Sequence, residues 1–367
     1  MRHKIMTTLG MCLIWILFMN SSHAGVAVSL RKDLDHNNFS FNVEWFLKKD
    51  RKSQVFDERL RNYQMYKDGI DESGKIMFVM YHRVRDDHGY YSRGIEDFKS
   101  DLEKMYSQGY HLISLQSYLN NSFEVPYGRT PIILTFDDGD ISNFRFITKD
   151  NQIIIDPDCV VGILDNFYDA HPEFGRHAVF YVNKDNPFGQ PQYLGEKIEY
   201  LITNGYEIGN HTTHHASLKT LNKLEIEHAI GENVAYFSTL NENLTLDSLS
   251  LPFGERPSDE TLIESVFSGY YEDVSYSNRI AFLVGWRPEK PLYDFENSPR
   301  FLNRVQSGDG IYQLGYWLDY FIENPEEKFI SDGDSGVITL RSTQNVIIEN
   351  ALLPVKIIDF NIMGGKN

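Results

Sequence analysis

The stretch PIILTFDDGD, residues 131–140, joins a short apolar run to two adjacent aspartates and a glycine. An apolar run of this length that ends in a turn signal predicts a buried strand. Two carboxylates at the end of such a strand repel each other and lose hydration, so they need compensation. The stretch therefore predicts that Asp137 and Asp138 lie at the end of a buried strand and serve a function there.

Around this stretch, strand-like and helix-like patterns alternate from residue 75 onward. The predicted strands are 75–82, 111–115, 131–136, 177–182, 206–210, 248–254 and 280–286. Between them, apolar residues at helical spacing, such as Phe98, Leu102 and Met105, predict helices. Strand–helix repetition predicts an α/β fold with a parallel sheet, open or closed into a barrel. In such folds the active site lies where the strands end at their carboxyl side.

The first 24 residues differ from the rest of the chain. Arg2 and Lys4 precede an apolar run over 9–19, and Ser22-His23-Ala24 fits a small-x-small cleavage site. This pattern predicts a secretory signal peptide and export to the periplasm or the exterior. An uncleaved N-terminal anchor is the alternative, and only then is a membrane a partner. The predicted organisation is a signal peptide over 1–24, a polar lead segment over 25–73, a main domain over 74–345 and a packed tail over 346–367.

The composition is that of a globular protein, with 367 residues, 41% hydrophobic and 24% charged. The 35 basic and 52 acidic residues give a net charge of −17, which disfavours nucleic acids and anionic membranes as partners. No P-loop, strand-borne G-x-G-x-x-G or G-x-S-x-G motif occurs, so neither a nucleotide cofactor nor serine-hydrolase chemistry is predicted. After residue 24 only Cys159 remains, which excludes an internal disulfide in the processed chain.

A second polar group, GNHTTHH at 209–215, also follows a predicted strand. His211 and His215 are four residues apart, so on one helical turn both imidazoles would face a metal; a solvated turn is the alternative. One aspartate of the pair would complete a shell of two histidines and a carboxylate, which leaves a position open for water or substrate. The other aspartate can then take a proton from that water.

Together these motifs resemble those of the polysaccharide deacetylases, also called carbohydrate esterase family 4 or the NodB-homology group. The resemblance runs over roughly residues 75–340, through VMYHRV, TFDDGD, EIGNHTTHHASL, LSLPFGERP, LVGWRP and FISDGD. It implies a distorted (β/α) barrel in which Asp137 is the catalytic base. It also implies that Asp138, His211 and His215 hold one divalent metal, Zn²⁺ in the first place and Co²⁺ or Ni²⁺ as alternatives.

The sequence departs from the family pattern at two places. The family's third motif usually reads Arg-x-Pro-Tyr or Arg-x-Pro-Phe, and Ser250 stands here at the arginine position. The backbone N–H of Phe253 is retained as a predicted oxyanion donor, with an ordinary turn as the alternative. The family's late histidine, a general acid, has no counterpart after His228. His82, in MYH, is the predicted substitute, as in the branch that acts on poly-N-acetylglucosamine; a structural role is the alternative.

Three further residues are predicted to contact substrate. Tyr81 and Trp286 could stack on a sugar ring, although core packing explains them as well. Arg300, or Arg304 in the same SPRFLNRV stretch, could replace the missing arginine; pairing at the surface is the alternative.

These residues predict an exported, metal-dependent hydrolase that removes N-acetyl groups from a polysaccharide containing N-acetylglucosamine. Two alternatives stay open. An O-acetyl esterase on a glycan such as xylan needs less help for its leaving group, which suits the missing late histidine. A glycan-binding module without catalysis is favoured by Ser250 together with that same absence.

Overall fold

The computed structural model describes residues 26–32, 39–45, 51–87, 89, 91–241, 244–294, 299–341 and 354–358. The predicted signal peptide and most of the predicted tail lie outside these residues. The chain divides into two compact units, Met1–Asp68 with Ile358–Asn367, and Gly69–Ile357. The first unit contains an antiparallel pair, β1 (Val26–Lys32) and β2 (Phe39–Trp45), and helix α2 (Arg51–Lys67).

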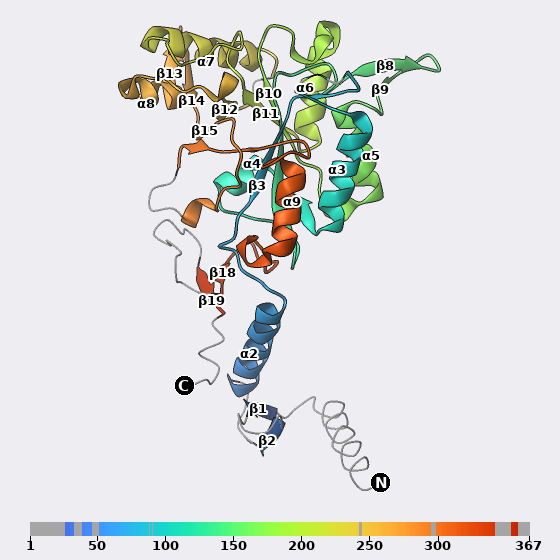
Figure 1. Ribbon diagram of the computed structural model, residues 1–367. Coiled ribbons are helices and arrows are strands. Elements are labelled where there is room, and N and C mark those ends of the chain that lie inside the picture. The colour runs from blue at the N-terminus through green and yellow to red at the C-terminus, as the bar shows by residue number, and fades with distance from the viewer. Residues whose placement is uncertain are drawn as a thin grey trace. The chain divides into compact units, whose positions relative to one another are not determined.

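The second unit is built on a parallel sheet, which confirms the prediction from the strand–helix alternation (Figure 1). Among the described residues this sheet has nine strands in the order β16-β15-β12-β11-β10-β7-β3-β17, with β6 beside β7. The strands are β3 (Met77–Tyr81), β6 (Tyr110–Leu112), β7 (Thr130–Phe136), β10 (Val179–Val182), β11 (Glu207–Asn210), β12 (Ser248–Ser250), β15 (Ile280–Phe282), β16 (Phe301–Leu302) and β17 (Val305–Gln306).

The two ends of this sheet are joined by one short segment. Strand β16 pairs with β15 at one end of the strand order, and β17 pairs with β3 at the other. Only Asn303 and Arg304 separate β16 from β17 in the chain. Residues 301–306 therefore bridge the two edges and curl the sheet into the distorted (β/α) barrel that was predicted.

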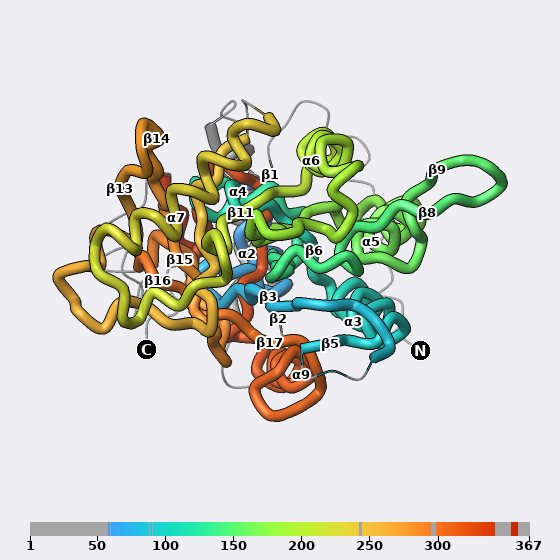
Figure 2. The backbone as a smooth tube through the Cα atoms, turned by 90° about the horizontal axis from the view of Figure 1, so that it is seen from above, coloured from blue at the N-terminus to red at the C-terminus, as the bar shows by residue number. Residues whose placement is uncertain are grey.

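Helices cover the outside of the barrel, as Figure 2 shows for α3, α5, α6, α7 and α9. The helices of this unit are α3 (Ile95–Ser107), α4 (Leu115–Leu119), α5 (Val160–Ala170), α6 (Leu194–Thr203), α7 (Lys223–Ser238), α8 (Ile263–Phe267) and α9 (Leu314–Glu323). In the part of the chain that the structure describes, no helix combines the length and the apolar character needed to cross a membrane.

Smaller strand pairs complete the unit. They are β4 (Arg83–Val84) with β5 (Ser92–Arg93), β8 (Phe146–Lys149) with β9 (Gln152–Ile155), β13 (Ser268–Tyr271) with β14 (Val274–Ser277), and β18 (Ile338–Leu340) with β19 (Val355–Ile357). The β8–β9 hairpin projects from the rim of the barrel (Figure 2).

Several predicted strands are longer than the observed ones. The strand predicted over 111–115 ends at Leu112, because Ser114 caps helix α4 by accepting a hydrogen bond from the backbone N–H of Ser117. The strands predicted over 248–254 and 280–286 end at Ser250 and Phe282, where the chain leaves the sheet to form loops at the carboxyl edge.

Each strand places alternate side chains in two different cores. In β7, Ile132, Leu134 and Phe136 pack toward the surrounding helices, whereas Ile133 packs inside the barrel. A strand turns successive side chains to opposite faces, so Thr135 and then Asp137 continue the inner row. Burying a large apolar side chain of this kind stabilises the fold by about 1.5–3 kcal/mol. The strand thus fixes the direction in which the first aspartate of the pair points.

Candidate functional site

The predicted polar residues gather at the carboxyl edge of the barrel. His82 directly follows β3, and Asp137 directly follows the neighbouring strand β7. The last residues of these two strands, Tyr81 and Phe136, are paired. The backbone N–H of Asp137 donates to the carbonyl oxygen of Tyr81 over 2.9 Å, so His82 and Asp137 leave the sheet side by side. His211 follows β11 at the same edge.

Asp138, His211 and His215 converge on one point. One ligand atom from each lies within 4.8 Å of the other two. The Nε2 atoms of His211 and His215 lie 3.2 and 3.4 Å from the same Oδ1 of Asp138. The Nδ1 atom of His211 lies 2.8 Å from the carbonyl oxygen of Ser250, which orients the ring and leaves Nε2 to act as a ligand. Two imidazole nitrogens and one carboxylate oxygen are donors that suit zinc, so these residues fit the implied metal.

The two histidines do not share a helical turn, so that part of the prediction is wrong. Residues 211–215 form a loop in which Thr212 and His215 have φ of +59° and +52°. The Asn210 side chain accepts from the Thr212 N–H over 2.8 Å and holds this turn. Asp138 also lies at positive φ, +75°. L-residues rarely adopt this backbone, and such strain is concentrated at functional sites.

Asp137 is held from inside the barrel by Arg304. The Arg304 guanidinium donates from Nη1 to Oδ1 over 2.8 Å and from Nη2 to Oδ2 over 2.7 Å. The hydroxyl of Ser250 donates to the same Oδ2 over 2.9 Å. Arg304 also donates to the Thr135 hydroxyl and to the carbonyl oxygen of Leu283. Arg304 is 0% exposed and Asp137 2%, so this is a buried ion pair with two parallel hydrogen bonds.

This environment determines the charge of Asp137. Burial acts to raise the pKa of the carboxyl group, but the charges of Arg304 and His211 and the hydrogen bond from Arg304 outweigh it. The pKa of Asp137 is therefore held well below its ordinary value, and the group is an ionised acceptor at neutral pH.

His82 lies within the electrostatic reach of the same groups. Burial lowers the pKa of its imidazole, against the opposing charges of Asp137 and Asp138, so the free protein carries it in the neutral form near pH 7. Its ring packs on Tyr91 with centroids 4.6 Å apart, and its carbonyl oxygen accepts from the Asn143 side chain over 2.7 Å. Its role as a proton donor stays a prediction.

Phe253 lies in a single 3₁₀ turn, Pro252–Gly254, directly beyond β12. Its backbone has φ of +60°, its side chain is 65% exposed, and its ring meets that of His215 edge to face at 4.7 Å. The residue thus borders the metal ligands, and its backbone N–H stays a predicted oxyanion donor.

The structure corrects two of the predicted substrate contacts. Tyr81 is 0% exposed, because its position in β3 faces helix α3; its hydroxyl donates to Asp101 over 3.0 Å and its ring packs on Phe98. Tyr81 therefore packs in the core, which was the alternative to a contact with substrate. Arg300 pairs with Glu264 over 2.6 Å and covers the ring of Phe267, so it does not reach Asp137.

Of the two arginines that could replace the missing one, Arg304 and not Arg300 meets Asp137. Ser250 is a second partner of Asp137, which the comparison with the family motif did not indicate. The alternation of side chains between the two faces of a strand could have indicated that Ser250 needs a partner. Ser248 and Ser250 both lie on the inner face of β12, where a hydroxyl needs a polar partner. Trp286, the third predicted substrate contact, is 55% exposed.

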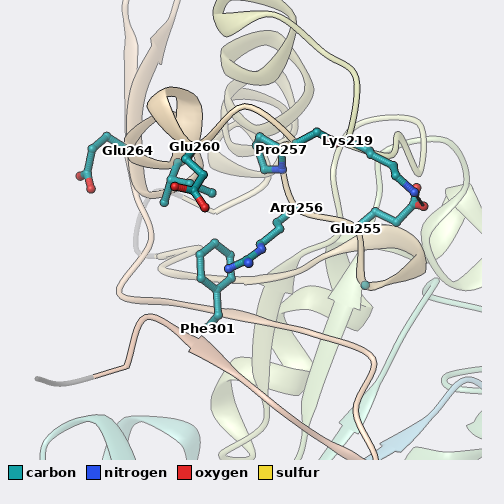
Figure 3. Close-up of a pocket in the computed structure, with 10 residues that line it drawn as sticks. Lys219, Glu255, Arg256, Pro257, Glu260, Glu264 and Phe301 are labelled. Atoms are coloured by element: carbon teal, nitrogen blue, oxygen red, sulfur yellow. Dashed lines mark hydrogen bonds and ion pairs between the residues drawn. The ribbon is translucent and has the colours of Figure 1, made fainter.

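A pocket of 730 Å³ opens beside the Phe253 turn (Figure 3). Gly254, Lys219, Glu255, Arg256 and Phe301 are among its lining residues, and Arg256 lies over the ring of Phe301 at 5.6 Å. None of the three converging ligands lines this pocket, so it adjoins the candidate site rather than containing it.

The comparisons with known proteins agree with this geometry. Residues 124–267 match the family model described as polysaccharide deacetylase, a stretch that holds Asp137, Asp138, His211 and His215. A search of curated proteins found no match.

Solved structures show weaker similarity. They include the Streptococcus pyogenes deacetylase PplD in complex with acetate, at 15% identity, with 67% of this chain and 98% of that chain covered and a TM-score of 0.48. BC0361, a polysaccharide deacetylase from Bacillus cereus, has 15% identity, coverage of 67% and 69%, and a TM-score of 0.49. IcaB from Ammonifex degensii has 17% identity, coverage of 68% and 98%, and a TM-score of 0.41. Over residues 124–267, which hold the converging ligands, this chain is thus similar to the polysaccharide deacetylase family.

Proposed function

We propose that this protein is a metal-dependent deacetylase that hydrolyses N-acetyl groups of a polysaccharide containing N-acetylglucosamine. The observation that carries the proposal is the meeting of two arrangements at one edge of the barrel. Asp138, His211 and His215 present three ligand atoms to one point, and the adjacent Asp137 is held ionised by Arg304. The match to the polysaccharide deacetylase model over residues 124–267 supports the reaction class, deacetylation, and the substrate class, a polysaccharide.

The side chains divide the work as follows. A divalent metal, proposed to be zinc, would supply Lewis-acid polarisation of the acetamide carbonyl and of a water molecule. Asp137 takes a proton from that water while the water oxygen forms a bond to the carbonyl carbon. The backbone N–H of Phe253 donates to the oxyanion that develops on the carbonyl oxygen. When the C–N bond breaks, the imidazolium form of His82 gives a proton to the departing amine, and the proton that Asp137 took from water replaces it on His82; the products are acetate and a glucosamine unit.

The test is acetate release from N-acetylglucosamine oligomers by the zinc-loaded full chain. Asp137→Asn should retain one bound zinc per chain, measured by titration calorimetry, and lose most turnover, because the amide cannot take the proton. Asp185→Asn, which changes an aspartate paired with His214 at the surface, is the matched control and should keep wild-type turnover. Full activity in Asp137→Asn would refute the assignment of the base.

One observation favours an O-acetyl esterase as the second candidate. The lowered pKa of His82 leaves little imidazolium near neutral pH, and an alkoxide leaving group needs protonation less than an amine does. Comparison of acetate release from acetylated xylan and from N-acetylglucosamine oligomers separates the two functions. The binding-module alternative is weakened, because Arg304 meets Asp137 where the family's motif arginine is missing.

Export is also part of the proposal and rests on the pattern of residues 1–24. Its test is N-terminal sequencing of the protein from the exported fraction. A processed chain that begins near residue 25 supports cleavage, and a membrane-bound chain that begins at residue 1 supports an anchor.

A further inference from the structure

A row of exposed aromatic side chains leads away from the candidate site. Phe253, Trp286, Tyr312 and Tyr316 are 65%, 55%, 43% and 36% exposed. Core packing does not explain rings that retain this much contact with water. Exposed aromatic residues that adjoin one another are typical of binding surfaces.

The row begins at the metal ligands. The Phe253 ring contacts that of His215, and the next residue, Gly254, packs so closely on the following loop that an added Cβ would lie 2.7 Å from the backbone nitrogen of Val284. Trp286 lies two residues after Val284, and two residues of fully extended chain span about 7 Å at most. Trp286 is therefore a near neighbour of the Phe253 turn.

Helix α9 and two loops hold the outer part of the row together. The Trp286 and Tyr312 rings have centroids 5.3 Å apart, and those of Tyr312 and Tyr316 are 5.1 Å apart. The indole Nε1 of Trp317 donates to the carbonyl oxygen of Trp286 over 3.0 Å, which ties the loop after β15 to α9. These three rings thus form a surface that exists before any ligand arrives.

The backbone at two of these aromatic residues is unusual. Phe253 and Tyr312 have φ of +60° and +61°, a region that bulky side chains seldom occupy. Neither ring is buried, so packing does not account for the conformation. Backbone strain of this kind is typical of positions that present a side chain to a ligand.

The charges near the row select among ligands. Tyr316 also lines a pocket of 300 Å³ with Asp309, Asp319 and Lys104, in which Asp309 pairs with Arg93 over 3.0 Å and lies 3.8 Å from Lys104. The chain's net charge of −17 favours a neutral or cationic ligand over an acidic one. The C–H faces of a hexopyranose stack on Trp and Tyr rings while its hydroxyl groups stay in water. A neutral or partly deacetylated amino-sugar chain has both properties.

We propose that Trp286, Tyr312 and Tyr316 form a platform that binds the sugar units next to the one being deacetylated. This inference rests on the proposed function. It makes the substrate a chain several units long, whose length beyond the reacting unit contributes to binding.

The test compares the kcat/KM for an N-acetylglucosamine hexamer with that for the dimer, using zinc-loaded full-length protein. The wild type should prefer the hexamer. Tyr312→Ala and Tyr316→Ala should each lower this preference about 3- to 10-fold, chiefly through the KM for the hexamer, as loss of one stacked aromatic contact predicts. Tyr270→Ala removes a tyrosine that is 69% exposed on β13 and should keep the wild-type preference.

A second readout separates this inference from the proposed function. Binding of the hexamer to the Asp137→Asn protein, followed by tryptophan fluorescence, does not depend on turnover. A weaker Kd in both platform variants supports the platform even if the wild type releases no acetate. Unchanged hexamer affinity and unchanged length preference in both variants would overturn it, and the deacetylase assignment would then stand or fall on acetate release alone.

Discussion

Replacement of Arg304 by methionine should turn Asp137 from a stabilising group into a destabilising one. Methionine keeps much of the side-chain volume but removes both hydrogen bonds from the guanidinium to Asp137. The hydroxyl of Ser250 still donates to the carboxylate. Asp137 would then be a buried charge without a counter-ion. Loss of one partner from a buried ion pair costs about 3–5 kcal/mol of unfolding free energy.

The cost should depend on pH in a direction that the structure fixes. In the wild type the folded-state pKa of Asp137 is depressed, so its contribution is present above the unfolded pKa of about 3.9 and is lost as pH falls through the folded pKa. In Arg304→Met the largest opposing charge is gone, so burial should raise the folded pKa of Asp137 above the unfolded one. The contribution of Asp137 to stability then decreases as pH rises. The difference between the two proteins should therefore be smaller near pH 3.5 than near pH 7, where it reaches the full 3–5 kcal/mol.

Urea unfolding at these two pH values measures the difference directly. Arg300→Met is the matched control, since Arg300 lies on the same segment but pairs at the surface with Glu264, and we expect a cost below about 1 kcal/mol. Arg304→Met combined with Asp137→Leu should recover much of the loss, because no buried charge remains. A cost that is equal at both pH values, or no larger than that of Arg300→Met, would refute the reasoning.

Three other outcomes are expected. Zinc at 100 times its Kd should raise the unfolding free energy by about 2.7 kcal/mol, measured by urea denaturation with and without a chelator, and His215→Ala should abolish the effect. His82→Ala should slow N-acetyl hydrolysis about 10²- to 10⁴-fold but ester hydrolysis much less, and equal losses on both substrates would contradict its role as an acid. Burial raises the pKa of Glu72 to about 8, so stability should fall by a few kcal/mol from pH 4.5 to 8 as the unfolded chain loses a proton that the folded one keeps. Glu72→Gln should flatten this profile in thermal melts, and an unchanged slope would point to another group.

The strands at the centre of the sheet could be predicted because each is a continuous apolar run. The strand predicted over 131–136 is Thr130–Phe136 in the structure, and the strand predicted over 177–182 is Val179–Val182. For the same reason, the sequence did not show that the Tyr81 side chain faces the helices. A strand buried on both faces shows no alternation between apolar and polar residues, so its pattern does not tell which side chains face the helices.

The closing segment could not be predicted in the same way. Strands β16 and β17 are two residues long each, too short for any period to appear, and they pair with strands at opposite ends of the order. For this reason Arg304 could not be told from Arg300. That His211 and His215 come together could be predicted, because they are only four residues apart in the chain. The way in which they converge, through left-handed residues, has no signature in a Thr-Thr sequence.

The position of Arg304 also sets an order of events during synthesis. Asp137 is made 167 residues before the guanidinium that compensates it. Until residues 301–306 have joined the two edges, a folded barrel would enclose a lone carboxylate, which is unfavourable. A nascent chain that ends before Arg304 therefore cannot assemble the finished site, because one segment, residues 301–306, supplies both the strands that join the two edges and the arginine that compensates Asp137.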